Sequence, residues 1–81
     1  MRVTVRLFAR FRDIAGGGEL CRDVASGATV ADVWRALTGE FPALSAYAGS
    51  MSVAVNADYA RMERTLGDGD EVAFLPPVSG G

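Results

Sequence analysis

The 81-residue sequence contains no histidine and no lysine, and its single cysteine is Cys21. Without histidine, no side chain titrates near neutral pH to activate a serine or cysteine nucleophile, which excludes Ser-His-Asp and Cys-His catalysis. Without lysine there is no Schiff-base residue and no phosphate-binding P-loop lysine. One cysteine cannot supply the four ligands of a structural zinc site. We therefore predict a chain that binds no metal and no cofactor and is not catalytic by itself.

An excess of positive charge and long apolar runs are also missing. The chain carries eight arginines against ten acidic residues, a net charge of -2, so it has no basic footprint for nucleic acid. No apolar run approaches the roughly 20 residues of a membrane span, and the first residues alternate where a signal peptide would be continuously apolar. A lone cysteine agrees with a reducing compartment. We expect a cytoplasmic protein that contacts neither nucleic acid nor membrane.

Short segments of alternating apolar and polar residues predict the strands of one sheet. The alternation is clearest near the N-terminus, where Val3, Val5 and Leu7 share one face. The first two strands are separated by a run of glycines, which favours a reversal and antiparallel pairing. We predict about five strands, at residues 2–8, 19–24, 51–55, 59–60 and 71–75.

One main helix is predicted over about residues 30–40. Thr29 is a suitable N-cap, and Asp32 stands three residues later, close to a capping box. Apolar residues then recur at helical spacing, at Val30, Val33, Trp34, Leu37 and Phe41. This stripe predicts an α+β domain over residues 1–75 in which the helix covers one sheet face, with Trp34 at the core edge. The acidic segment Asp68–Glu71 is interpreted as a tight turn before the last strand, not as a calcium loop.

After the last strand comes a short tail, residues 76–81, that lacks large side chains. Pro76 and Pro77 stiffen its base, and Gly80 and Gly81 fit a narrow channel. Six extended residues reach roughly 20 Å, enough to carry a terminal carboxylate into another protein's active site. A frayed terminus explains the same composition, so the residues alone leave both interpretations open.

The segment from Leu66 to Gly81 resembles the C-terminus of the small subunit of molybdopterin synthase, the MoaD type of sulfur carrier. It has that family's Asp-Gly-Asp-Glu turn, strand, Pro-Pro and terminal Gly-Gly in the same order. The segment from Leu7 to Asp13, followed by glycine, is similar to the family's opening. The resemblance implies a ubiquitin-like β-grasp fold, with a mixed sheet covered on one face by the main helix and a flexible C-terminal tail.

The resemblance also implies how such a chain works. In that family the C-terminal glycine, here Gly81, is adenylated with ATP by an E1-like enzyme and is then converted to a thiocarboxylate with sulfur from a donor protein. The tail inserts into the large synthase subunit of a heterotetramer, where sulfur passes to cyclic pyranopterin monophosphate. The ATP belongs to the activating enzyme. The inserted residues here are Pro76, Pro77, Val78, Ser79 and Gly80.

Alternation also predicts a docking surface. If Val72 and Phe74 face the helix, Leu75 and Phe8 point to the opposite sheet face. Clustered exposed apolar residues mark an interface, and local packing at the strand ends is the alternative. Tyr59 is the third predicted docking residue.

Other roles stay open at this point. The rival functions are a sulfur carrier for thiamine, cysteine or tRNA thiolation, and a ubiquitin-like protein modifier. A modifier without lysine could only be the donor in an isopeptide bond. Arg10 and Arg12 are interpreted as solvated, with contact to the activating enzyme as the alternative. Cys21 is interpreted as a small buried or edge residue rather than a thioester site.

Overall fold

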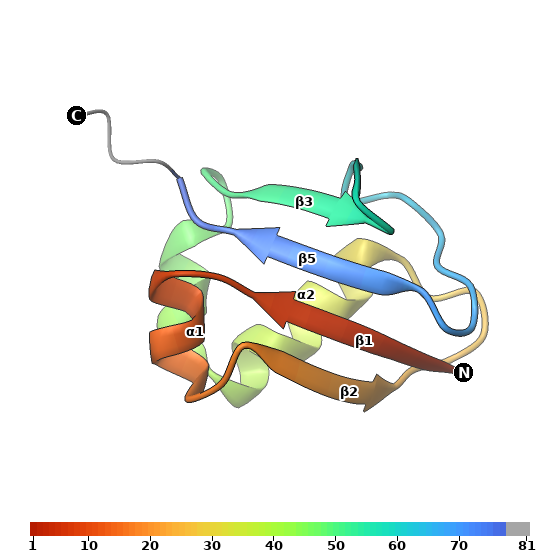
Figure 1. Cartoon of the computed structure of the whole chain (residues 1–81), viewed down its shortest axis with the longest axis horizontal. Helices are drawn as coiled ribbons and strands as arrows, with labels where there is room; N and C mark the ends of the chain where they lie inside the picture. The colour runs from red at the N-terminus through yellow and green to blue at the C-terminus, as the bar shows by residue number, and fades with distance from the viewer. Residues whose placement is uncertain (78–81) are drawn as a thin grey trace.

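The computed structural model describes residues 1–77, which form one five-stranded sheet with its main helix on one face (Figure 1). The strands are β1 (Arg2–Leu7), β2 (Glu19–Asp23), β3 (Ser52–Val55), β4 (Asp58–Tyr59) and β5 (Glu71–Leu75). Their order in the sheet is β2-β1-β5-β3-β4. β1 pairs antiparallel with β2 and parallel with β5, and β5 pairs antiparallel with β3. This mixed sheet confirms the predicted β-grasp arrangement.

The predicted strands differ from the observed ones only at their ends. The residues that lie just outside the strands are Phe8, Val24, Met51 and Ala60. β4 begins at Asp58, one residue before the predicted start, because two residues suffice for the reversal. These are Asn56 and Ala57, with φ values of 50° and 73°. Positive φ at both positions gives the tight hairpin turn whose twist matches that of the strands.

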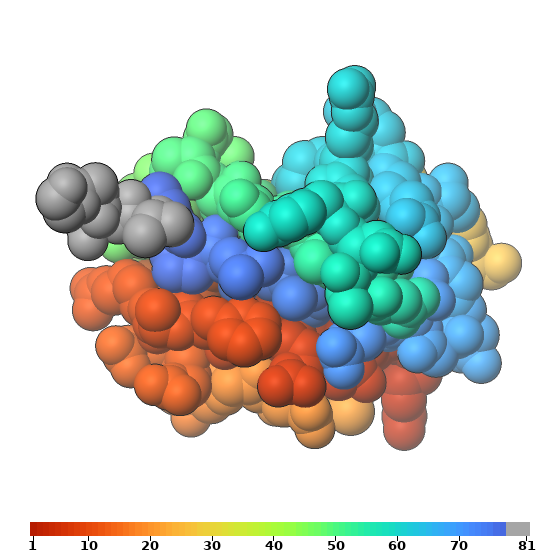
Figure 2. Space-filling model, turned by 45° about the horizontal axis from the view of Figure 1, so that its top comes forward, coloured from red at the N-terminus to blue at the C-terminus, as the bar shows by residue number. Residues whose placement is uncertain are grey.

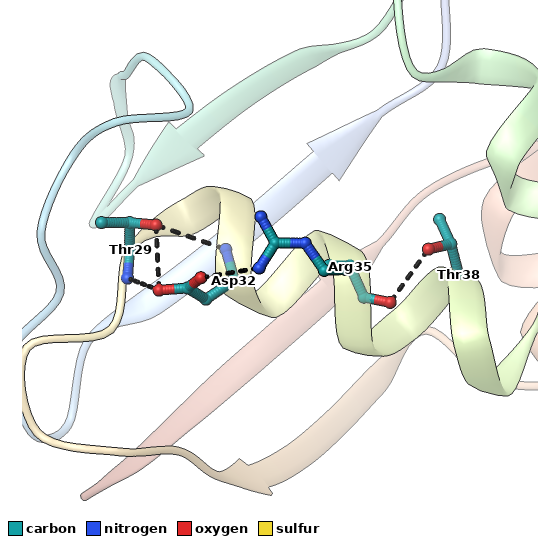
Figure 3. A network of polar contacts seen from close by, with 4 residues as sticks. All are labelled: Thr29, Asp32, Arg35 and Thr38. Atoms are coloured by element: carbon teal, nitrogen blue, oxygen red, sulfur yellow. Dashed lines mark hydrogen bonds and ion pairs between the residues drawn. The ribbon is translucent and has the colours of Figure 1, made fainter.

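The main helix, α2, spans Val30–Glu40 as predicted. The Thr29 hydroxyl accepts a hydrogen bond from the Asp32 backbone N–H at 3.3 Å, and the Asp32 carboxylate accepts one from the Thr29 backbone N–H at 2.9 Å (Figure 3). This complete capping box satisfies two backbone donors at the start of the helix. The Thr29 backbone bond is the main reason why the pKa of Asp32 is lowered. Two shorter helices are α1 (Arg10–Ala15) and η1 (Pro42–Tyr47).

The core lies between the sheet and α2. Within residues 1–77, every buried side chain is apolar. The strand residues facing the helix are at most 2% exposed and confirm the predicted inward set: Val3, Val5, Leu7, Val72 and Phe74. Trp34 is 5% exposed, and its ring centroid lies 5.6 Å from that of Phe11 and 5.0 Å from that of Phe74. Trp34 is therefore a full core residue, more central than the predicted core edge, because Phe11 of α1 also packs against it.

The segment before β5 is a tight turn, as predicted. Gly69 has a φ of 84°, which favours glycine at this position. The Asp70 carboxylate accepts hydrogen bonds from the Gly67 backbone N–H at 2.8 Å and from the Asn56 side-chain amide at 2.9 Å. These bonds lower the pKa of Asp70, the Gly67 bond most of all. The carboxylate is thus occupied in joining this turn to the β3–β4 hairpin.

Candidate functional site

The end of β5 and the end of β1 lie beside each other. Leu7 and Phe74 are register partners in the parallel pair, and both are buried. Because side chains alternate along a strand, the residues that follow them, Phe8 and Leu75, leave the core. Phe8 is 39% exposed and Leu75 is half-buried. The structure therefore brings together two of the three residues predicted to dock a partner.

A mostly apolar groove of about 510 Å³ lies at this end of the molecule. It is lined by Phe8, Ala9, Arg10, Tyr47, Leu75, Pro76 and Pro77. Figure 2 shows the orange chain that follows β1 next to the blue end of β5. The described chain leaves the domain along the groove, since Pro76 and Pro77 form part of its wall. The groove is thus suited to hold an apolar surface of a partner at the base of the tail.

Sequence reasoning missed two wall residues, Ala9 and Tyr47. The Tyr47 ring packs edge-on against Phe11, with ring centroids 5.1 Å apart. This contact joins η1 to α1 and fixes one side of the groove. The signal that the sequence offered for Tyr47 is that an aromatic residue stands in a connector without other chemistry. Its packing partner, Phe11, lies 36 positions earlier in the chain, so the contact is not visible in the local sequence.

Ala9 adopts a strained backbone conformation, with φ 50° and ψ -123°. The Phe11 backbone N–H donates to the Phe8 carbonyl at 3.0 Å, which closes a tight turn around Ala9. A residue with a Cβ held in such a sparsely populated region costs of order 1–3 kcal/mol. The turn redirects the chain from β1 into α1 within two residues and leaves Phe8 exposed at the groove.

Arginines of β1 and α1 stand near Phe8 in the chain. The Arg6 guanidinium lies 5.7 Å from the Phe8 ring centroid and forms ion pairs with Glu71 at 3.6 Å and Glu19 at 4.0 Å. Arg10 lines the groove itself. Arg12 is exposed on α1. Within residues 1–77, neither Arg10 nor Arg12 takes part in an ion pair. This surface therefore suits a partner whose apolar contact residues are surrounded by acidic groups.

Tyr59, the third predicted docking residue, does not line this groove. It is 83% exposed and faces a separate hollow of about 400 Å³ together with Met51 and Met62. Its register partner Ala54 pairs in turn with Ala73 of β5, so Tyr59 shares the open sheet face with Leu75. Its docking role stays a prediction.

The remaining predicted site residues fall in two groups. Cys21 is exposed on β2, which is an edge strand of the sheet, so it is an edge residue and not a buried one. Four tail residues lie outside the described part of the chain, and their roles stay predictions: Val78, Ser79, Gly80 and Gly81.

Two further classes of feature are absent from residues 1–77. No group of three or more cysteine, aspartate or glutamate side chains is placed to hold a metal ion in this part of the chain. No helix there has the length and the apolar character needed to cross a membrane.

Comparison with known protein families assigns the chain to one of them. A family model described as the ThiS family matches residues 5–81, nearly the whole chain. The chain belongs to the ThiS family. The match includes the Pro-Pro-Val-Ser-Gly-Gly end, which sequence reasoning had singled out.

Individual proteins agree with this family membership. The chain is 36% identical to the molybdopterin synthase sulfur carrier subunit of Chlamydomonas reinhardtii, over the full length of both. Its sequence is 35% identical to that of SAMP1 from Haloferax volcanii. The crystal structure of SAMP1 matches the fold with a TM-score of 0.88 and full coverage of both chains. A complex of subunits 1 and 2 of molybdopterin-converting factor from Helicobacter pylori contains a chain that is 27% identical, with a TM-score of 0.70 and full coverage of both chains.

Proposed function

We propose that this ThiS-family protein is a sulfur carrier and that it serves as the small subunit of molybdopterin synthase. The observation that carries the proposal is the family match, which extends through Gly81 at the end of the tail. The full-length relative from Chlamydomonas reinhardtii is a molybdopterin synthase sulfur carrier subunit, which supports the choice of pathway. The lack of histidine and lysine agrees with chemistry that takes place in partner active sites.

The reacting group in this proposal is the carboxylate of Gly81. A carboxylate is a poor electrophile, so an E1-like enzyme first joins it to AMP from ATP, and pyrophosphate leaves. Sulfur that a donor protein supplies at the oxidation level of sulfide then displaces AMP and gives the thiocarboxylate. Its sulfur is a good nucleophile, and in the large subunit it forms a carbon–sulfur bond to cyclic pyranopterin monophosphate. Water then cleaves the bond between the sulfur and the Gly81 carbonyl carbon, so the sulfur stays on the pterin and Gly81 returns to the free carboxylate.

The groove at the base of the tail has a defined part in this proposal. A partner seated on Phe8 and Leu75 meets the domain where Pro76 and Pro77 leave it. The six residues after Leu75 can reach at most roughly 20 Å from there. Docking at the groove therefore fixes how deep the terminal carboxylate lies in the partner. The Helicobacter pylori complex of two converting-factor subunits supports a partner subunit of this kind.

The proposal is tested by reconstitution with the cognate large subunit and cyclic pyranopterin monophosphate. Thiocarboxylated protein should yield molybdopterin, and the unmodified protein should not. A variant that lacks Gly81, or that carries one additional residue after it, should keep the fold but lose the activity. Retained activity in either variant contradicts the proposal, because each one moves or removes the reacting carboxylate.

A protein modifier is the second candidate. It is favoured by the likeness to SAMP1, the small archaeal modifier protein 1 of Haloferax volcanii, whose structure agrees with a TM-score of 0.88 over the whole chain. The two functions differ in their product. A modifier ends in an amide bond between Gly81 and a lysine of another protein, whereas a sulfur carrier returns to the free carboxylate. Mass spectrometry of lysines that carry the C-terminal peptide of this chain, residues 65–81 after trypsin cleavage at Arg64, in cells with and without this protein separates them.

A further inference from the structure

An activated carboxyl group at Gly81 is reactive toward primary amines as well as toward sulfur. When an amine attacks an acyl adenylate, a C–N bond forms, the C–O bond to the phosphate breaks, AMP leaves and the amine releases a proton to solvent. This reaction needs no oxidant or reductant. Any primary amine that the tail can reach would therefore divert the activated carrier into an amide.

The chain offers very few such amines. All eight of its basic side chains are arginine. The guanidinium group of arginine is delocalised and stays protonated at neutral pH, so it does not act as a nucleophile. The α-amino group of Met1 is the one primary amine in this sequence.

The Met1 amino group is held in the sheet. It donates a hydrogen bond to the Val24 carbonyl at 2.8 Å, and the Val24 backbone N–H donates to the Met1 carbonyl at 2.8 Å. These bonds extend the β1–β2 ladder by one pair beyond Arg2 and Asp23. The Met1 side chain is half-buried and packs against the core. Acylation of this amine requires that the end of the ladder open.

The sheet topology also separates Met1 from the tail. β1 and β5 run parallel, so the start of β1 and the end of β5 lie at opposite ends of the sheet (Figure 1). Leu75 lies beside Phe8, and the seven residue-to-residue steps from Met1 to Phe8 span about 23 Å. The six residues after Leu75 reach at most roughly 20 Å, less once the chain has reversed direction. Gly81 therefore cannot meet the Met1 amine of its own chain.

We propose that this protein is an acyl donor that is protected from amide formation on itself. It neither cyclises nor forms chains of its own copies, and it is a poor acceptor for any other amine-directed modifier. The self-conjugation part rests on the function proposed above. The protection of Met1 and the lack of other amines do not, so each can be tested alone.

The first experiment needs no activating enzyme. The folded protein is treated with an N-hydroxysuccinimide ester of acetate, and ester adducts are removed with hydroxylamine before intact mass is measured. A variant with a four-residue Gly-Ser extension before Met1 is the matched control, because its amine is free of the ladder. We expect one amide-linked acetyl group at most, formed roughly five- to tenfold more slowly than in the control, the factor that one hydrogen bond supplies. Equal rates, or a second amide-linked group, overturn the proposal.

The second experiment uses the E1-like enzyme and ATP without a sulfur donor, with glycinamide as a trap in one arm. The wild-type chain should be trapped by glycinamide, yet without the trap it should show neither loss of one water nor an amide-linked dimer. Arg12→Lys places an amine on α1 at the tail's end of the molecule, four residues after Phe8, and should give a cyclised product. Arg2→Lys, at the opposite end of β1, is the matched control and should not.

The outcomes of the second experiment are distinguishable from a failure of the proposed function. A wild-type chain that loses water or forms amide-linked dimers contradicts the protection. A trapped wild type combined with an uncyclised Arg12→Lys chain also contradicts it, because something other than the lack of amines then prevents the reaction. If glycinamide traps nothing, activation itself has failed, which contradicts the proposed function, and the acetylation experiment alone decides this inference.

Discussion

Leu7 and Phe74 are partners across the parallel β1–β5 pair, and both side chains are buried in the core. The next residue on each strand, Phe8 and Leu75, lines the groove at the base of the tail. The core and the candidate docking surface thus come from the same two strands, one residue apart. Substitutions in the groove should therefore alter partner binding while leaving the fold intact.

Leu75→Asp tests this separation. Leu75 is half-buried at the groove, so a carboxylate at this position stays hydrated in the free protein. In the complex the same carboxylate would be buried in an apolar interface, which is unfavourable. We expect binding to the large subunit to weaken by about 2 kcal/mol or more, as for an apolar interface anchor. Isothermal titration calorimetry measures the affinity, and urea unfolding checks that the domain is still folded.

The matched control for Leu75→Asp is Ala25→Asp. Ala25 is exposed in the turn after β2, at the other end of the sheet, and the substitution adds the same charge. Affinity should be close to that of the wild type. A Leu75→Asp protein that binds as tightly as this control would show that the groove is not the docking surface.

Ala9→Gly should stabilise the protein. Glycine adopts φ 50° and ψ -123° without strain, so the substitution removes the strain energy at this position. Glycine also increases the conformational entropy of the unfolded chain, and this cost offsets only part of the stabilisation. We expect the free energy of unfolding to rise by roughly 0.5–2 kcal/mol in urea titrations. Ala48→Gly is the matched control: Ala48 is exposed with φ -55° and ψ -32°, so the same change there should destabilise by about 0.5–1 kcal/mol. If both variants lose stability, the turn at Ala9 is not strained.

Asp70 predicts a specific acid dependence of stability. The hydrogen bonds from Gly67 and then from Asn56 lower its pKa in the folded state. The unfolded chain then binds the proton more tightly, so the stabilisation is complete above the ordinary carboxyl pKa of about 3.9 and is lost as the pH falls through the folded value. Asp70→Asn should be less stable than the wild type at neutral pH.

The measurement for Asp70 is urea unfolding of both proteins over a series of pH values. The stability difference between wild type and Asp70→Asn should shrink steadily below about pH 4, because the protonated acid and the amide then bond alike. A difference that stays constant down to pH 2 would mean that the carboxylate charge contributes nothing at this turn.

The sequence predicted most of the fold because its local signals agree. The alternation near Val3 to Leu7, the cap at Thr29 and the apolar stripe of α2 each specify an element without help from distant residues. Trp34 was predicted at the core edge because a helix stripe alone does not reveal that Phe11 of α1 packs against it.

The candidate site was less accessible to sequence reasoning. The alternation of side chains along a strand predicted that Phe8 and Leu75 point away from the core, because alternation is a local property of the sequence. The groove also needs Tyr47 and the strained turn at Ala9, which are brought in by tertiary packing between segments far apart in the chain. The function was suggested by the resemblance of the C-terminal segment, whereas its composition alone left a frayed terminus equally open.

The central claim concerns one atom at Gly81, and intact mass tests it most directly. The purified protein is incubated with the E1-like enzyme, ATP and the sulfur-donor protein, and its mass also shows whether the chain ends at Gly81. We predict a gain equal to the exchange of one oxygen for one sulfur, located at Gly81 by fragmentation and absent without ATP. An unchanged mass with an active enzyme, or sulfur found on Cys21 instead, would contradict the account.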